Sequence, residues 1–193
     1  DCCRQTDGAA ATILCRADIA ERFTDKPVYV AGVGMATDVP YVHEKESFTE
    51  FVATVRAVKQ AYSMSGLTPS DIDVVECHDC FTITEILNIE DLGFCEKGEG
   101  GRMVERGETQ IEGRLPVNPS GGLLTKGHPL GASGIAQMVE LYWQLREDVP
   151  SQDPRRQVEL RKGNALQPNV GGGVSPTPWL PSSPAMRRLY SKN

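Results

Sequence analysis

Two neighbouring residues, His78 and Cys80, stand where acid/base chemistry is feasible. They lie in Cys77-His-Asp-Cys-Phe81, between an apolar run at 72–77 that predicts a buried strand and a helical pattern that starts at Phe81. Ligands of α/β proteins collect at the carboxyl ends of strands, and N–H groups at a helix start lower the pKa of a nearby thiol. An acid/base role for Cys80 follows. A buried structural cysteine beside a hydrogen-bonded histidine is the alternative that these residues leave open.

His128 lies in the glycine-rich segment 118–134. Glycines on both sides let the backbone approach a ligand closely, and Pro129 stiffens the chain beside the imidazole. A histidine held in one orientation suits a general base. A turn that only contains a histidine is the alternative. The third histidine, His43, stands in a polar connection, which is typical of a solvated surface residue.

Three other patterns carry little weight. Gly32-Val-Gly34 follows a predicted strand, as in a dinucleotide-binding motif, but the third glycine is missing. Gly131-Ala-Ser-Gly-Ile135 lacks the glycine that a nucleophile elbow needs at its fifth position. Cys77, His78, Cys80 and Cys95 do not provide two Cys-x-x-Cys units, because Cys95 stands alone, so no metal site is expected.

The composition indicates a soluble globular protein rather than a nucleic-acid or membrane binder. The chain has 193 residues, a net charge of −6 and 39% hydrophobic residues, which suits one domain or one domain with a piece of another. Its acidity opposes binding to nucleic acid and to anionic lipid, and no apolar run approaches the roughly 20 residues of a membrane helix. Six cysteines in a chain of this size are expected to be reduced thiols, which indicates a cytoplasmic location.

Strands and helices alternate along the chain, which favours α/β layering. A capping box, Ser47-Phe-Thr-Glu50, predicts a helix start, and Gly66 predicts the end of that helix. Residues 96–130 show no periodicity and are expected to form a long folded loop, with room for a hairpin. The other expected elements are strands at 8–15, 27–33, 72–77 and 164–169 and helices at 18–23, 81–92 and 135–146.

Two boxes in order, VECHDCFTITEILNIEDLGFCEKGEG and then NPSGGLLTKGHPLGASG, resemble the C-terminal half of a thiolase of the sterol-carrier-protein type. Conventional thiolases carry Asn-Glu-Ala-Phe where this chain has His78-Asp-Cys-Phe81, whereas Gly127-His-Pro129 is shared across the family. The resemblance extends from about Asp7 to Leu166. It implies an α/β fold, a thiolase-like C-terminal half with a βαβαββ mixed sheet layered with helices.

The resemblance also implies a reaction, the CoA-dependent thiolysis of a 3-ketoacyl-CoA or the reverse Claisen condensation of acyl-CoA. His128 resembles the base that activates a nucleophilic cysteine, and His78 resembles a donor of the enolate oxyanion hole. Cys80 resembles the acid/base thiol of this subfamily, and Gly171 resembles the second backbone oxyanion donor. Conventional thiolases hold the acid/base thiol in a C-terminal Cys-x-Gly box, where this chain reads Asn169-Val-Gly171.

By the same resemblance, Asn118, Gly127 and Phe81 contact the substrate. No cofactor is expected to be bound permanently, and coenzyme A thioesters are expected as substrates. The nucleophilic cysteine of the family belongs to an N-terminal half that precedes these boxes. The expected partners are therefore acyl-CoA or CoA and either a thiolase N-terminal half or a second copy of the chain.

The resemblance, together with the places where it begins and ends along the chain, predicts the domain organisation. Residues 1–26 correspond to the end of the N-terminal half, 27–173 to the thiolase C-terminal domain, and 174–193 to an atypical proline-rich tail. The family ends in a central strand, but prolines cannot donate to a sheet ladder, so no such strand is expected in the tail. The ending Ser191-Lys-Asn193 is near a peroxisomal Ser-Lys-Leu signal without matching it, so a peroxisomal location is the alternative in a eukaryote.

Two other functions remain open at this point. The chain could be a non-catalytic, thiolase-like subunit that binds acyl-CoA within a larger complex. It could also be a truncated product without activity, which the proline-rich tail favours.

Overall fold

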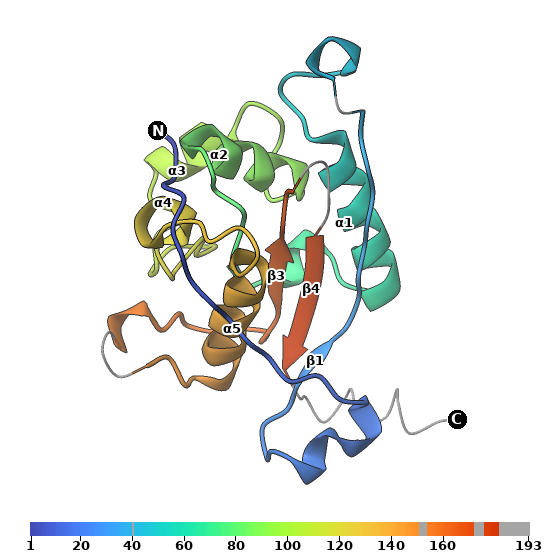
Figure 1. Cartoon of the computed structure of the whole chain (residues 1–193), viewed down its shortest axis with the longest axis vertical. Helices are drawn as coiled ribbons and strands as arrows, with labels where there is room; N and C mark the ends of the chain where they lie inside the picture. The colour runs from blue at the N-terminus through green and yellow to red at the C-terminus, as the bar shows by residue number, and fades with distance from the viewer. Residues whose placement is uncertain (40, 151–153, 172–175, 182–193) are drawn as a thin grey trace.

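A computed structural model describes residues 1–39, 41–150, 154–171 and 176–181 of the chain. Four strands form one mixed sheet in the order β1-β4-β3-β2, in which β2 and β3 are parallel and β4 runs antiparallel to both β1 and β3. Figure 1 shows this sheet with helices packed around it. The expected α/β fold with a βαβαββ order is confirmed. The strands are β1 (Val28–Val30), β2 (Val74–Val75), β3 (Ala165–Pro168) and β4 (Pro176–Pro181).

Helices cover both faces of the sheet. The two residues of β2 show this, because neighbouring side chains in a strand point to opposite faces. Val75 belongs to a buried cluster with side chains of α1 and α2, whereas Val74 belongs to a second cluster with side chains of α5. The helices are α1 (Val52–Ser65), α2 (Thr82–Asp91), α3 (Gly100–Glu105), α4 (Gly122–Lys126) and α5 (Ser133–Arg146). A 3₁₀ helix of six residues occupies Ala17–Arg22, and 3₁₀ helices of three residues occupy Val42–Glu44, Pro69–Asp71 and Pro154–Arg156.

The start of α1 corrects one prediction. The helix begins at Val52 rather than beside Ser47, and the Ser47 hydroxyl accepts a hydrogen bond from the Thr49 N–H instead. The Phe51 N–H donates to Asp91 Oδ2 at 2.8 Å, so a carboxylate from the end of α2 caps this helix. The end of the helix is as predicted, because Gly66 adopts φ +71° and donates to the Tyr62 carbonyl.

The segment 96–130 corrects a second prediction, because it contains the short helices α3 and α4. They have six and five residues, which is too short for apolar spacing to repeat. The helices expected at 81–92 and 135–146 are confirmed as α2 and α5, and the strands expected at 72–77 and 164–169 as β2 and β3.

Both ends of the chain differ from expectation. Residues 8–15 form no strand, and Ile13 and Leu14 are exposed because no strand among the described residues pairs with this segment. The proline-rich segment contributes β4, a strand inside the sheet, where none was expected. Residues two apart in a strand direct their backbone N–H positions toward the same neighbouring strand. The N–H groups that Pro176 and Pro178 lack are therefore missing on one edge of β4 only. Strand β1 pairs with the stretch of β4 from Trp179 to Pro181.

The predicted domain boundaries remain predictions, and residues 174–175 and 182–193 of the predicted tail lie outside the described residues. Among the described residues, no helix is long and apolar enough to cross a membrane.

Candidate active site

The carboxyl end of β2 gathers the site. Because Val75 pairs with Leu166 in parallel strands, the residues three positions further on also meet, and His78 Nδ1 lies 2.8 Å from Asn169 Oδ1. On the other edge of β2, Asn118 donates its N–H to the Val75 carbonyl at 2.8 Å. The strand therefore brings the first sequence box beside the second.

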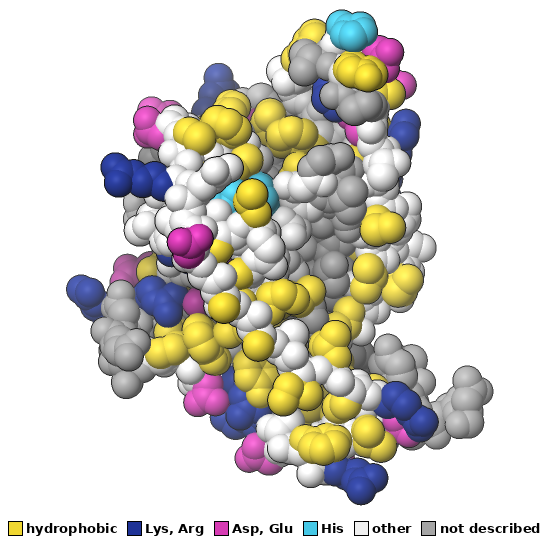
Figure 2. Space-filling model, viewed as in Figure 1, with side chains coloured by type: hydrophobic (Ala, Val, Ile, Leu, Met, Phe, Trp, Pro, Cys, Tyr) yellow, Lys and Arg dark blue, Asp and Glu magenta, His cyan; other side chains and the backbone are white. Residues whose placement is uncertain are grey.

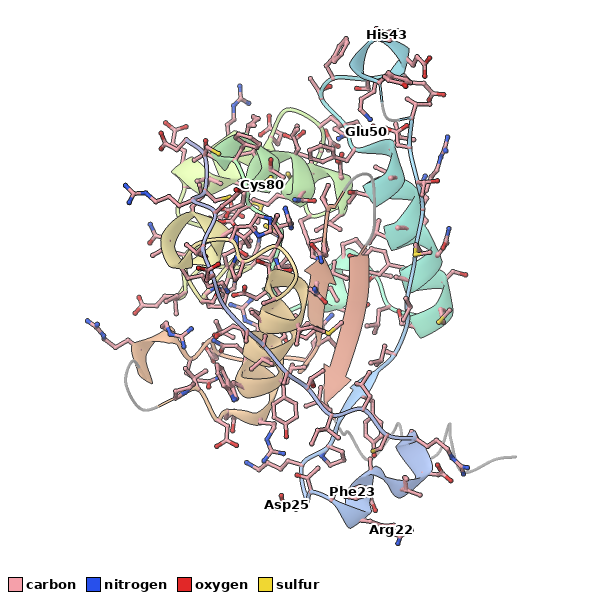
Figure 3. All side chains as sticks on the ribbon, in the orientation of Figure 1. Arg22, Phe23, Asp25, His43, Glu50 and Cys80 are labelled. Carbon is pink, nitrogen blue, oxygen red and sulfur yellow. The ribbon has the colours of Figure 1, made fainter. Side chains whose placement is uncertain are left out.

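His128 faces His78 across this edge. Gly127, at φ +87°, turns the chain after α4, and the His128 N–H donates to the Arg4 carbonyl at 2.8 Å. The two imidazole centroids are 4.9 Å apart with their planes at 88°, an edge-to-face contact. Both rings are buried. The two histidines singled out in the sequence thus come together, and His43 lies on a separate excursion of the chain (Figure 3).

Hydrogen bonding favours one tautomer of His128. The Ser133 hydroxyl donates its single proton to the Pro129 carbonyl at 3.0 Å, and its oxygen lies 2.7 Å from His128 Nδ1. With the hydroxyl proton directed to the Pro129 carbonyl, that oxygen accepts from Nδ1–H. The neutral ring then carries its lone pair on Nε2, for which the described part of the chain offers no hydrogen-bond partner. His128 is arranged to take a proton at Nε2.

His78 is held differently. Its Nδ1–H donates to the amide oxygen of Asn169, an atom that only accepts. Burial is the largest influence and lowers the pKa of His78, and His128 also lowers it; Asn169 and Asp79 act in the opposite direction. Donation from Nε2 to an oxyanion requires that His78 gains a proton or that the Asn169 amide turns to donate to Nδ1.

Cys80 and Cys77 occupy contrasting places. Cys80 is half-buried at the start of α2, where its Sγ lies 3.9 Å from Thr84 Oγ1 (Figure 3). Cys77 is fully buried, and burial raises the pKa of its thiol well above the ordinary value. Asn118 Nδ2 donates to Cys77 Sγ at 3.3 Å. Cys80 is thus the half-buried thiol beside His78, and Cys77 is a core residue.

The residues expected to contact substrate have varied positions. Asn118 directs its side chain inward, where Oδ1 accepts from the Cys77 N–H and Nδ2 donates to Glu85 Oε2, both at 2.8 Å. Phe81 is half exposed. Gly171 is exposed two residues beyond Asn169. Their contacts with substrate, and that of Gly127, stay predictions.

Glu76, Asp79 and Ser133 are buried polar residues of the site that sequence reasoning missed. Glu76 accepts from the Ser120 N–H at 2.9 Å and from its hydroxyl at 2.8 Å. Burial is the chief cause that raises the pKa of Glu76 to about 7, with Lys126 opposing it. The only signal in the sequence was that the three residues lie within the two boxes that carry the resemblance.

An open hollow of about 370 Å³ adjoins His128. Its walls are residues 6–10 of the N-terminal segment and 129–132 of the loop before α5. Apolar side chains gather along the course of this segment on the surface (Figure 2). Within the described ranges, no group of histidine, cysteine and carboxylate side chains is placed to hold a metal ion.

Comparisons with known proteins identify the family of this chain. The family model described as "Thiolase C-terminal domain-like" matches residues 34–177. An acetyl-CoA acetyltransferase of Methanothermobacter thermautotrophicus is 52% identical over 172 residues, covering 89% of this chain and 44% of that protein. Sterol carrier protein 2 of Bos taurus is 45% identical, covering 89% of this chain and 32% of that protein. The chain thus spans less than half the length of these relatives.

Solved structures give the same result. The solved structure of an Ltp2-ChsH2(DUF35) aldolase matches with a TM-score of 0.72 and 25% identity, over 85% of this chain and 42% of that chain. The Bacillus anthracis acetyl-CoA acetyltransferase matches with a TM-score of 0.52 and 18% identity, over 80% of this chain and 30% of that one, which concerns the fold alone. The resemblance noted in the sequence is confirmed, and the chain belongs to the thiolase C-terminal domain-like family.

Proposed function

We propose that this chain is the C-terminal part of an acyltransferase that catalyses thiolysis of 3-ketoacyl-CoA or the reverse condensation of acyl-CoA. The nucleophilic cysteine comes from a thiolase N-terminal half. The observation that carries the proposal is the opposed pair His78 and His128, with Cys80 two residues from His78 and, within the described residues, no partner for the lone pair of His128 Nε2.

In the thiolysis direction, His128 Nε2 takes the proton of the nucleophilic thiol, and the thiolate attacks the 3-keto carbon. The bond between C2 and C3 breaks, and the enolate of the leaving acyl-CoA receives a proton from the Cys80 thiol. CoA then gives its thiol proton to the Cys80 thiolate and attacks the acyl-enzyme, which releases the shortened acyl-CoA. His128 returns the first proton to the nucleophilic cysteine.

Negative charge develops on the thioester oxygens in these steps, and donors already in place stabilise it. His78, once it donates from Nε2, serves the enolate oxygen. Loss of one oxyanion donor typically lowers a rate by about 10²–10³. Proton transfer by a positioned base contributes about 10²–10⁴.

The N-terminal segment supports the need for a second half. Ile13 and Leu14 are 95% and 71% exposed, although the segment 8–15 has the composition of a buried strand. An exposed apolar segment of this kind marks an interaction site. We assign its partner as the sheet of the N-terminal half, which would also complete the hollow beside His128.

The test is acetoacetyl-CoA thiolysis by this chain combined with the N-terminal half of the Methanothermobacter thermautotrophicus relative. We expect activity from the combination, none from this chain alone, and a loss of about 10²–10⁴ in kcat for His128→Ala. The matched control is His43→Ala, which removes an exposed histidine and should keep the parental rate. An unchanged rate for His128→Ala sinks the proposal.

A non-catalytic subunit is the second candidate. The name of the similar aldolase joins two proteins, Ltp2 and ChsH2(DUF35), which favours assembly with a different partner. Acyl-CoA binding without turnover in the combined preparation would favour this candidate.

A further inference from the structure

Asp79 stands between His78 and Cys80 in the chain, yet its side chain belongs to a different contact. The carboxylate is buried and accepts two backbone hydrogen bonds from α4. Oδ1 accepts from the Leu123 N–H at 2.6 Å, and Oδ2 accepts from the Leu124 N–H at 3.4 Å. One carboxylate therefore joins the box of His78 and Cys80 to the helix that precedes His128.

Two glycines make this contact sterically feasible. Gly121 and Gly122 adopt φ values of +90° and +63°, in the left-handed region that favours glycine. A Cβ atom at position 122 would overlap Asp79 Oδ2. The glycine pair thus lets the start of α4 sit directly against the carboxylate.

One turn of α4 connects the residue that Asp79 holds to His128. The Gly127 N–H donates to the Leu123 carbonyl at 3.0 Å. Leu123 therefore links the two, because its N–H donates to Asp79 and its carbonyl accepts from Gly127. His128 follows immediately. Glu76 and Asn118 anchor the earlier part of the same segment, and Lys126 adds an ion pair to Glu76 at 3.6 Å.

We propose that Asp79 is a positioning residue, whose carboxylate holds α4 so that His128 faces His78 across the site. The claim that Asp79 places α4 and His128 is argued from the contacts above. Its catalytic consequence rests on the proposed function.

The other end of β2 offers a matched control. Asp73 is also buried, and its Oδ2 accepts from the Lys162 N–H at 2.7 Å and the Gly163 N–H at 2.5 Å. It anchors a backbone loop in the same way, but that loop carries no histidine. Asp73→Ala and Asp73→Asn therefore repeat the loss of a buried anchor without disturbing α4.

The first readout is the nuclear Overhauser effect between the His78 and His128 ring protons in the full chain. Only three histidines are present, so the ring signals are few, and exposed His43 serves as an internal reference. We expect Asp79→Ala to lose the effect, Asp79→Asn to weaken it, and both Asp73 variants to keep it. Far-UV circular dichroism identifies any variant that fails to fold, and Asp79→Asn then decides, because Asn retains one acceptor for the Leu123 N–H.

The second readout is kcat and KM for thiolysis in the combined enzyme. A misplacement of about 1 Å costs about 10²-fold, so Asp79→Ala should lower kcat by about 10–100-fold with KM nearly unchanged, and Asp79→Asn should recover part of the loss. A folded Asp79→Ala that keeps both the ring contact and kcat overturns the proposal, as does an equal loss for Asp73→Ala. If the parental combination has no activity, the proposed function fails, and the ring contact still decides the role of Asp79.

Discussion

The two ends of β2 make an instructive comparison. At the amino end, Asp73 accepts hydrogen bonds from four consecutive N–H groups of the loop 161–164. At the carboxyl end, Asp79 accepts from the N–H groups of Leu123 and Leu124. Both carboxylates are buried, and both tie a strand end to a distant loop.

The ends differ in what the anchored loops carry. The loop beside Asp73 is closed by further contacts, such as the bond from Asn164 Nδ2 to the Asp71 carbonyl and the ion pair between Lys162 and Asp71. The loop beside Asp79 leads to His128, whose Nε2 has no partner within the described ranges. The same kind of anchor therefore supports a candidate active site at the end where it presents an acid/base group with spare hydrogen-bonding capacity, and closes a loop at the other end.

The largest expected effect on stability is at the amino end. Asp73→Ala removes the acceptor of four partly buried backbone hydrogen bonds, each worth about 1 kcal/mol, so we expect the free energy of unfolding to fall by about 4 kcal/mol. Urea unfolding measures this change. A loss below about 1 kcal/mol would contradict the structural role that the comparison gives to Asp73.

Glu76, beside the carboxyl end, should make stability depend on pH. Its folded pKa of about 7 lies above its ordinary value of 4.5, so the folded chain holds a proton that the unfolded chain releases. This contribution is complete below about pH 4.5 and is lost as the pH rises through about 7. The loss is up to about 3 kcal/mol, at about 1.4 kcal/mol per pH unit of pKa difference. Urea unfolding of Glu76→Gln should lack this decline, and parallel profiles for both proteins would contradict it.

Ser133→Ala should have a smaller effect, confined to activity. The substitution removes the acceptor of His128 Nδ1–H, so the tautomer with its lone pair on Nε2 is no longer favoured. We expect kcat/KM for thiolysis to fall about 10-fold, which corresponds to about 1.4 kcal/mol. Ser133→Thr keeps the hydroxyl and is the control. Equal rates for Ser133→Ala and Ser133→Thr would remove the tautomer argument.

The smallest expected effect is on the pKa of His78, which an NMR titration measures. Its pKa should lie below the ordinary 6.5, because burial disfavours the charged ring. The lowered pKa means that the unfolded chain binds a proton first, so this group makes the fold less stable as the pH falls below 6.5. Asp79→Asn removes a carboxylate that raises the pKa of His78, and a further decrease is expected. An increase would contradict the influence assigned to Asp79, whereas a pKa of the parental His78 above 6.5 would show that burial is not the main influence.

The sequence predicted those elements whose signals are local. Apolar spacing identified α2 and α5, and Gly66 marked the end of α1. The start of α1 could not be predicted because its cap, Asp91, comes from 40 residues further along the chain. The strand β4 was missed because a strand that contains prolines depends on which neighbours need its N–H groups.

The site shows the same division. His78, Cys80 and His128 stood out as candidates from their places after a strand and among glycines, and their catalytic roles stay predictions. Their supports were not, because the partners of Ser133 and Asp79 are set by a tautomer and by a helix start that appear only in three dimensions. A carboxylate between two candidate catalytic residues gives no sign in the sequence that it turns toward α4.

The most direct test of the central claim, that the carboxyl end of β2 carries the acid/base chemistry, compares two cysteines of the same box. Thiolysis is measured for Cys80→Ala and Cys77→Ala in the combined enzyme. We expect kcat to fall by about 10²–10⁴ for Cys80→Ala, the half-buried thiol beside His78, and to stay near the parental value for Cys77→Ala, the fully buried one. Equal rates for the two variants would contradict it.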